Sequence, residues 1–409
     1  MTAGITDAAV DALLDEPLDP ATKPLPPARG PLTARTLGAH GWSVRDLLLP
    51  ALVLRETALA HNVAAMAAFC AGRGVALAPH GKTTMAPQIF RAQLAAGAWG
   101  ITAATIAQVR AYRGWGVERV LMANELVQPA ALRWLAAELD ADPAFEFLCL
   151  VDSEAAVERM TAALGTARRP VRVLVELGNV RTGARSVAAA VAAGRAAARS
   201  PALELAGLEG YEGTLGADRA ARTVADVDAF LDALRETADA LGLGDDAVVT
   251  AGGSAYFDRV VERLGGLPGR LVLRAGCYVT HDHGMYEGLS PLTGTLRPAL
   301  ELWAEVLSAP EPGFAVAGFG KRDAPYDIRL PQPLARVRPT GEHEDLEGRV
   351  TVEQLNDQHA FLRCDGVRLA VGDLLVCGVA HPCTAFDKWR LIPTVDDDLA
   401  VTGAIRTFF

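Results

Sequence analysis

The chain has 409 residues, of which 50% are hydrophobic and 22% are charged, proportions typical of a globular protein with one or two large domains. No apolar run reaches the roughly 18–20 residues that span a bilayer, and the acidic N-terminus lacks the basic and apolar regions of a secretion signal, so we expect no membrane partner. The formal net charge is −10, from 39 basic and 49 acidic residues without a basic stripe, which argues against a nucleic-acid partner.

The first 45 residues contain the proline-rich stretch LDEPLDPATKPLPPARGPL, which fits neither a helix nor a central strand. We therefore expect an extended N-terminal arm over residues 1–45. Its residues 16–32 either brace an interface between subunits or remain disordered.

From about residue 50, short apolar runs alternate with alanine-rich helical segments, the pattern of a parallel sheet built from βα units. The expected strands lie at 50–54, 75–79, 99–103, 118–123, 146–151, 171–176, 203–211, 247–251 and 271–274. Nine strands are one more than a closed (β/α)8 barrel needs. A doubly wound open sheet is the alternative, but it would favour an early GxGxxG motif, which the chain lacks. The sequence thus predicts an α/β fold, a TIM-like (β/α)8 barrel, over residues 46–288.

Beyond residue 288 the helical periodicity fades. Short strand-like segments such as ELWAEVLSA, FAVAGFG and LLVCGVAH are separated by Gly, Pro and Asp turns. These features predict a separate, mostly β C-terminal domain over residues 289–409.

Barrel enzymes place their functional groups at the carboxyl ends of the strands. Lys82 follows strand 75–79 in a tight His-Gly turn, where its amine could form a Schiff base with a carbonyl cofactor or could remain a solvated loop lysine. Arg181 follows strand 171–176 between Gly178 and Gly183, where it could reach an anionic oxygen or lie on a surface loop.

Three further strand ends carry candidate groups. Tyr211 closes strand 203–211, a position that suits a half-buried ring as well as a catalyst. A glycine-rich turn follows strand 247–251 and opens a helix at residue 255; its N–H groups could form a nest for a phosphate, or the turn could be a flexible one with an ordinary serine cap. The residues of that turn are Gly252, Gly253 and Ser254.

The last strand end carries Arg274, Gly276 and Cys277, and the glycine again lets backbone N–H groups face an anion. Each of these signals is modest alone. Their placement at five strand ends predicts one site at the carboxyl end of the barrel.

His381 and Cys383 lie two residues apart on a segment that we expect to be extended, so both side chains would point to one face and could bind a divalent metal such as Zn²⁺. Two protein ligands leave open positions, as a catalytic ion requires. The alternative is a core cysteine beside a hydrogen-bonded histidine. His281 and His283 form a second cluster, which we interpret as a loop that supports the site, although its spacing could also suit a metal.

The six cysteines are scattered and contain no CxxC motif; they are Cys70, Cys149, Cys277, Cys364, Cys377 and Cys383. This pattern suits reduced thiols better than a disulfide framework. We therefore expect a cytoplasmic protein.

From about residue 46 to its C-terminus, the chain resembles the alanine-racemase-like, fold-type III enzymes that use pyridoxal 5'-phosphate (PLP). The run APHGKTTMAPQIFRAQLAAGAWGITAAT is most similar to the D-threonine aldolase and D-serine dehydratase branch, whose PHxKTH-like turn holds the Schiff-base lysine. This resemblance implies that Lys82 holds PLP. One departure is Thr84 in place of the last histidine of that turn, which suggests a subgroup with an altered substrate preference.

The resemblance also assigns roles to the other strand ends. Arg181 would contact the phenolic oxygen of PLP, and Tyr211 matches the aromatic residue of the sixth strand end. Arg274 would face the pyridine nitrogen. The phosphate would be held by backbone groups of Gly252, Gly253, Ser254, Gly276 and Cys277. If Lys82 closes the first barrel strand and Arg274 the eighth, the surplus strand 50–54 would pair with the second domain.

The C-terminal motif separates the branches that this resemblance covers. In the dehydratases a His-x-Cys pair forms a zinc site, whereas the D-threonine aldolases typically carry His-x-Asp and use manganese-like ions. With His381 and Cys383, the chain resembles the dehydratases. We therefore expect a lyase that removes water from D-serine or another D-3-hydroxy amino acid, leaving a 2-oxo acid and ammonia. It would use PLP and a divalent metal, zinc before manganese or magnesium.

Three alternative functions remain open. The same groups could carry out retro-aldol cleavage to glycine and an aldehyde, or a racemase reaction without release of ammonia. A non-catalytic PLP-binding protein is the third, but such relatives are usually a lone barrel. In this family the second domain of one subunit typically completes the active site of the other, so the resemblance also implies a homodimer with shared active sites.

Overall fold

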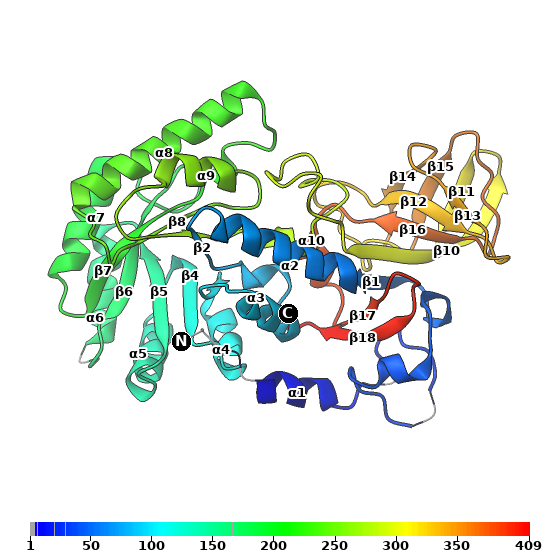
Figure 1. The fold of residues 1–409 in the computed structure, drawn as a ribbon, viewed down its shortest axis with the longest axis horizontal. Helices are drawn as coiled ribbons and strands as arrows, with labels where there is room; N and C mark the ends of the chain where they lie inside the picture. Colours follow the sequence, from blue (N-terminus) through cyan, green and yellow to red (C-terminus); the bar gives the residue numbers. More distant parts are fainter. Residues whose placement is uncertain (1–4, 6, 20, 29, 166) are drawn as a thin grey trace.

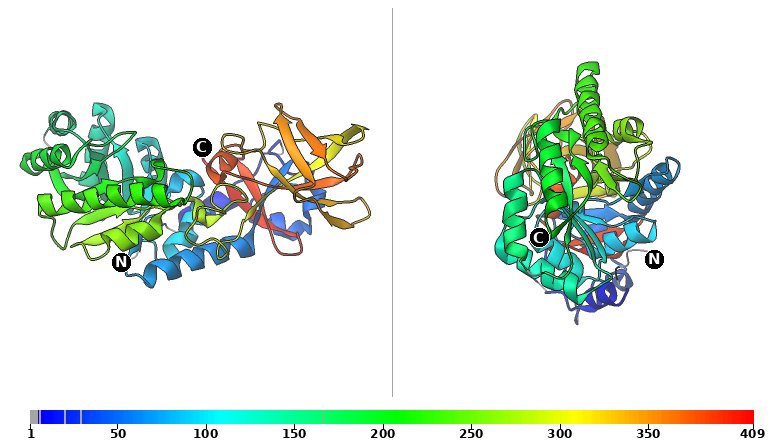
Figure 2. Two further views of the ribbon diagram at one scale, coloured as in Figure 1. Left: turned by 90° about the horizontal axis from the view of Figure 1, so that it is seen from above. Right: turned by 90° about the vertical axis from the view of Figure 1, so that its left-hand side faces the viewer.

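The computed structural model describes residues 5, 7–19, 21–28, 30–165 and 167–409. An α/β barrel fills one end of an elongated molecule and antiparallel sheets fill the other (Figures 1 and 2). The predicted combination of a barrel with a mostly β C-terminal part is confirmed. Among the described residues, no helix combines the length and apolar character needed to cross a membrane.

The barrel is a parallel eight-stranded sheet in the order β2-β9-β8-β7-β6-β5-β4-β3. Its strands are β2 (Ala76–Leu77), β3 (Ile101–Ala103), β4 (Arg119–Glu125), β5 (Glu146–Val151), β6 (Val171–Leu177), β7 (Leu203–Gly210), β8 (Val248–Ala251) and β9 (Arg270–Leu273). The two edges of the sheet meet, because a parallel bridge joins His80 to Thr102 and the Trp99 N–H donates to the Leu77 carbonyl at 2.7 Å. Each of the nine predicted strands overlaps an observed strand.

Eight helices alternate with these strands, and most of them cover the outside of the barrel (Figure 1). They are α2 (Glu56–Ala71), α3 (Pro87–Ala95), α4 (Ile106–Gly114), α5 (Pro129–Ala141), α6 (Glu154–Leu164), α7 (Val187–Arg199), α8 (Ala221–Leu241) and α9 (Phe257–Leu264). Ser153 and Ser186 cap α6 and α7, since each hydroxyl accepts a backbone N–H of the first turn. Inside the barrel, a small layer of apolar side chains that includes Leu121, Leu148 and Leu174 fills the axis.

The second part is built from strands β1 and β10–β18. They are β1 (Ala51–Arg55), β10 (Leu300–Glu311), β11 (Phe314–Ala317), β12 (Gln332–Val337), β13 (His343–Asp345), β14 (Val350–Leu355), β15 (Ala360–Cys364), β16 (Leu374–Gly378), β17 (Leu391–Val395) and β18 (Val401–Arg406). Strand β1 lies between β10, to which it is antiparallel, and β17, to which it is parallel. The chain therefore contributes β1 to the second part before it forms the barrel, and it returns to the second part with β10. The expected boundary near residue 288 falls in the connection that precedes β10.

The N-terminal arm differs from the expected extended segment. Helix α1 (Asp7–Asp15) precedes the prolines, and two short 3₁₀ helices follow them, η1 (Leu37–His40) and η2 (Val44–Asp46). The arm is anchored to its own chain, because Leu25, Leu32 and Leu37 are buried against the second sheet. Residues 1–4, 6, 20 and 29 of the predicted arm lie outside the described residues.

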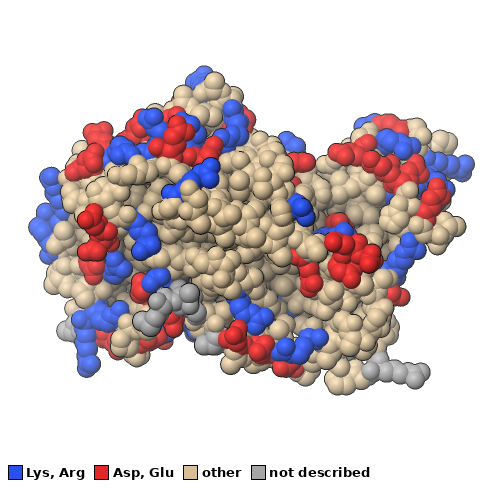
Figure 3. Space-filling view, viewed as in Figure 1, with Lys and Arg blue, Asp and Glu red and all other residues tan. Residues whose placement is uncertain are grey.

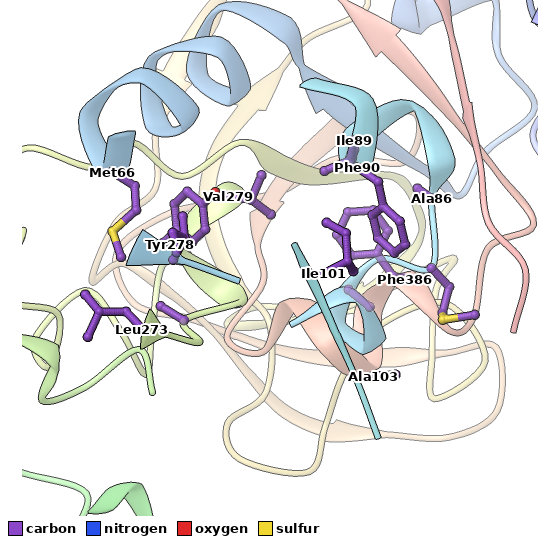
Figure 4. Close-up of a cluster of buried hydrophobic side chains, with 14 of the residues drawn as sticks. Met66, Ala86, Ile89, Phe90, Ile101, Ala103, Leu273, Tyr278, Val279 and Phe386 are labelled. Atoms are coloured by element: carbon purple, nitrogen blue, oxygen red, sulfur yellow. The ribbon is translucent and has the colours of Figure 1, made fainter. Parts of the chain in front are cut away.

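A buried cluster joins the two parts of the molecule (Figure 4). It brings together Met66 of α2, Phe90 of α3, Ile101 of β3 and Phe386 of the short helix α10 (Pro382–Phe386), and all four side chains are almost fully buried. Helix α10 follows β16, so this packing fixes a segment of the second part against the first barrel strands. On the face shown in Figure 3, acidic and basic side chains are interspersed.

Candidate functional site

A cavity of about 550 Å³ opens where the carboxyl ends of the barrel strands meet the segment after β16. Ten of the eleven predicted site residues line it: Lys82, Arg181, Tyr211, Gly253, Ser254, Arg274, Gly276, Cys277, His381 and Cys383. Gly252 does not line the cavity. The volume falls within the roughly 300–1,000 Å³ that small-molecule sites occupy.

Lys82 stands in the 3₁₀ helix η3 (Gly81–Thr83), directly after the first barrel strand. A Cβ at Gly81 would lie 2.5 Å from the Phe90 ring and 2.5 Å from the Tyr112 hydroxyl, so only glycine allows this turn to sit on the buried cluster of Figure 4. Burial, reinforced by the positive charges of Lys82 and Arg274, holds the pKa of His80 well below its ordinary value. The lysine is therefore held on a rigid turn beside a neutral imidazole.

Arg274 enters the cavity from the end of β9 and forms a buried ion pair with Glu209 of β7. One of its terminal nitrogens also donates to the Gly210 carbonyl at 2.9 Å, whereas its Nε has no hydrogen-bond partner. Burial raises the pKa of Glu209 to about 7, although the neighbouring guanidinium acts to lower it. A buried donor without a partner is rare, so the Nε is a candidate contact for a bound ligand.

The glycine turn after β8 corrects one prediction. Its N–H groups do bind an anion, but that anion is the buried Glu212 carboxylate, which accepts from Gly252 at 3.0 Å and from Gly253 at 2.8 Å. Helix α9 begins at Phe257 rather than at 255. Glu212 thus occupies the N–H donors that were predicted for a phosphate. Ser254 and Cys277, the first residue of the 3₁₀ helix η5 (Cys277–Val279), also line the cavity.

Arg181 and Tyr211 lie together at the cavity wall, with the guanidinium carbon of Arg181 4.6 Å from the centre of the Tyr211 ring. Burial and the charge of Glu212 raise the pKa of Tyr211 to about 12, so the hydroxyl stays protonated at neutral pH. The loop that carries Arg181 is tied down where Gly178 and Gly183 meet closely. The arginine side chain is exposed at the cavity wall, where it can meet an anion.

His381 and Cys383 reach the cavity from the second part of the molecule, but not from an extended segment as predicted. Pro382 occupies the first position of α10, which proline favours because its fixed φ suits a helix start. His381 is therefore the cap residue and Cys383 lies in the first turn. Both side chains nevertheless line the same cavity.

The two side chains are held by hydrogen bonds. The Nδ1 atom of His381 lies 2.6 Å from the Asp327 carboxylate, and the Cys383 sulfur lies 3.3 Å from the Thr83 hydroxyl and 3.5 Å from the Cys277 sulfur. Burial acts to lower the pKa of His381, but Cys383 and Asp327 outweigh it and raise the pKa to about 9. The contact with Cys277, together with His381, holds the pKa of the Cys383 thiol well below its ordinary value.

An imidazole held by a carboxylate and a nearby thiol are the donors that zinc prefers. The imidazole of His381 and the thiol of Cys383 are therefore chemically suited to bind a divalent ion. Within the described ranges, no group of three or more His, Cys, Asp or Glu side chains is already arranged to hold a metal ion. His381 and Cys383 are thus the two predicted protein ligands of such an ion.

The second histidine cluster lies behind the cavity wall rather than in it. His281 is almost fully buried and has a left-handed backbone, with a φ of 49°. The His283 N–H donates to the Val379 carbonyl at 3.0 Å, and a Cβ at Gly378 would meet the His283 ring at 2.5 Å. This loop therefore packs against the segment that leads to His381, and its supporting role stays a prediction.

Sequence reasoning missed several polar groups of the site. Glu209 lies near the end of β7 and Glu212 lies two residues beyond that end, and two carboxylates at one predicted strand end were a usable signal. Thr83 directly follows the predicted lysine. Asp327 offered no signal, because it lies 54 residues before His381 in a loop without a motif.

Two family models match the chain. The model "Alanine racemase, N-terminal domain" matches residues 54–264, more than half of the chain. The model "Putative serine dehydratase domain" matches residues 299–395, the segment that carries His381 and Cys383.

Two curated proteins are similar over most of their length. The 3-hydroxy-D-aspartate aldolase of Paracoccus denitrificans (strain Pd 1222) is 26% identical over 338 residues, which are 78% of this chain and 85% of that protein. The D-threonine aldolase of an Arthrobacter species is 28% identical over 327 residues, 77% of this chain and 80% of that protein.

Solved structures share the fold. D-threonine aldolase from Filomicrobium marinum is 25% identical, with a TM-score of 0.76 over 90% of this chain and 97% of that chain. D-threo-3-hydroxyaspartate dehydratase from Delftia sp. HT23 is 22% identical, with a TM-score of 0.73 over 90% of this chain and 99% of that chain. Because a single family model accounts for more than half of its residues, the chain belongs to the alanine racemase N-terminal domain family.

Proposed function

We propose that the protein is a PLP-dependent lyase that eliminates water from D-serine or a related D-3-hydroxy amino acid, giving a 2-oxo acid and ammonia. One observation carries this proposal: a single cavity holds Lys82 from the barrel and the His381–Cys383 pair from the second part. An amine that can take a proton at Cα thus faces a donor pair that can hold a metal near the β-hydroxyl.

The cavity fits the cofactor. A Cβ at Gly276 would lie 2.5 Å from the Thr83 hydroxyl oxygen, so only glycine lets the segment after β9 pack this closely against the turn that carries Lys82. Lys82 would hold the cofactor covalently, the unpartnered Nε of Arg274 would meet its pyridine nitrogen, and Arg181 its phenolic oxygen. When bound, PLP would draw electron density away from the substrate's Cα.

The side chains around the cavity then have separate roles in the proposed reaction. Lys82 removes the Cα proton, and the neutral His80 beside it adds no competing positive charge. Glu209 keeps Arg274 in place through their ion pair. His381, fixed by Asp327, and Cys383 would hold a divalent ion, which supplies Lewis acidity at the cavity wall. A thiolate among the ligands favours zinc over magnesium.

Retro-aldol cleavage to glycine and an aldehyde is the second candidate, and the names of the two curated relatives favour it. It differs in the bond that breaks, Cα–Cβ instead of Cβ–O, and in needing a base at the β-hydroxyl. The match of the serine dehydratase model over the segment with His381 and Cys383 supports elimination.

Product analysis separates the two reactions. We expect the enzyme, supplied with PLP and Zn²⁺, to convert D-serine and D-threonine into 2-oxo acids with one ammonia per turnover. The L-enantiomers serve as matched controls and should remain unchanged. Glycine and an aldehyde without any 2-oxo acid would contradict the proposal and establish the aldolase reaction.

We also propose that a second copy of the chain covers the cavity mouth. Val180, next to Arg181, is 69% exposed, and Tyr326 and Ile328, which flank Asp327, are 49% and 42% exposed. Large apolar side chains around a site commonly mark an interface. Light scattering should give about twice the chain mass of 43.0 kDa, and a mass of 43.0 kDa would contradict the homodimer.

The cytoplasm is the proposed location. All six cysteines are free thiols, which suits a reducing compartment.

A further inference from the structure

Two cysteines meet across the junction between the barrel and the second part of the molecule. Cys277 begins η5, just after β9, and Cys383 lies in α10, which Figure 1 places between the barrel and the antiparallel sheets. Their sulfur atoms are 3.5 Å apart. At this separation the sulfurs are in direct contact, so no other atom lies between them.

This pair differs from the other cysteines. Cys70, Cys149, Cys364 and Cys377 are buried, and no other cysteine pair is in hydrogen-bonding contact in the described part of the chain. Cys277 and Cys383 both line the cavity, and Cys383 is only partly buried. A small oxidant that enters the cavity therefore has better access to Cys383, the more exposed of the two, and Cys277 is in direct contact with it.

We propose that Cys277 and Cys383 form a reversible disulfide when hydrogen peroxide enters the cavity. Cys383 attacks the peroxide, its S–O bond forms as the O–O bond breaks, and one water leaves with a sulfenic acid remaining on the protein. Cys277 then attacks that sulfur, the S–S bond forms, the S–O bond breaks and a second water leaves. Together the two thiols lose two electrons and two protons, and the peroxide is reduced to two waters.

The consequence follows from the position of Cys383. The sulfurs must approach from 3.5 Å to about 2.05 Å, and the Cys383 sulfur is then no longer available as a thiolate donor. The bond would also tie α10 covalently to the barrel. Loss of metal binding is the part of this inference that rests on the proposed function; the disulfide itself does not.

The test is peptide mapping of the full chain, stripped of metal by a chelator and treated with stoichiometric peroxide. Trypsin leaves Cys277 in the peptide 275–321 and Cys383 in the peptide 369–388, which also holds Cys377. The variant Cys377→Ser removes that ambiguity, and it should still give the cross-linked pair of peptides. Dithiothreitol should release the two peptides, and Cys277→Ser should abolish the cross-link.

Sulfinic acid on Cys383 without a cross-link, or a cross-link that persists in Cys277→Ser, would overturn the inference. Zinc added before the peroxide should slow cross-linking, because a bound thiolate is protected. If zinc has no effect while the cross-link forms, the disulfide stands and the metal assignment of the proposed function fails. The two proposals are therefore tested separately.

Discussion

Replacement of Lys82 by alanine should reduce turnover of D-3-hydroxy amino acids by about 10³-fold or more, because the variant loses both the covalent attachment of the cofactor and the group that moves the Cα proton. The turn itself should survive, since Gly81 and the buried cluster behind it do not depend on the lysine side chain. Steady-state rates with the substrate from the product assay measure the effect, and the thermal unfolding midpoint checks the fold.

The matched control is Lys321→Ala, which removes an exposed lysine that lies 5.7 Å from the centre of the Tyr326 ring. We expect it to retain the activity of the unmodified protein. A Lys82→Ala variant with more than a tenth of the original rate would show that another amine does the chemistry.

Replacement of His381 by alanine should lower zinc affinity by at least about 100-fold and remove most of the activity, because one of two proposed protein ligands is lost. Asp327→Asn should have a smaller effect, about 10–100-fold on metal affinity, since the amide orients the imidazole less strongly than the carboxylate does. Competition with a chromophoric chelator measures both affinities.

The graded order of these two variants is the informative result. His343→Ala, on the exposed strand β13, is the matched histidine control and should bind zinc as the unmodified protein does. Equal zinc affinity in His381→Ala and the unmodified protein would exclude the metal role. A loss of affinity in His381→Ala with none in Asp327→Asn would exclude a positioning role for Asp327.

The barrel could be predicted from the sequence because its signal is local. Buried parallel strands read as short apolar runs such as VRVLVE, and alanine-rich segments between them favour helix. The resemblance then singled out the lysine and arginine of the strand ends, which the structure brings to one cavity.

The parts that could not be predicted depend on contacts distant in the sequence. Glu212 takes the N–H groups of Gly252 and Gly253 across 40 residues, and nothing local distinguishes that carboxylate from a solvated one. Asp327 meets His381 only because the loop after β11 folds back over α10. The segment around Cys383 seemed extended because its few residues carry no helical period, whereas Pro382 starts a helix of five residues.

The strand pieces of the second part were predicted less completely than the barrel. Strands β12, β13 and β17 had no counterpart among the expected segments, since β13 has three residues and the prolines Pro333 and Pro393 interrupt the other two. Helix α1 was not predicted, because the amphipathic run DAAVDALLD is only nine residues long and directly precedes the proline-rich stretch.

The proposed function depends on one lysine, at the first strand end of the barrel, that carries PLP. The chain has four lysines, Lys23, Lys82, Lys321 and Lys388, so this attachment has a direct measurement: borohydride reduction of the protein loaded with PLP, followed by peptide mapping. We predict a visible absorption band that borohydride abolishes, with the label on Lys82. A protein that stays colourless after free PLP is removed, or a label on one of the other three lysines, would exclude Lys82 as the residue that carries PLP.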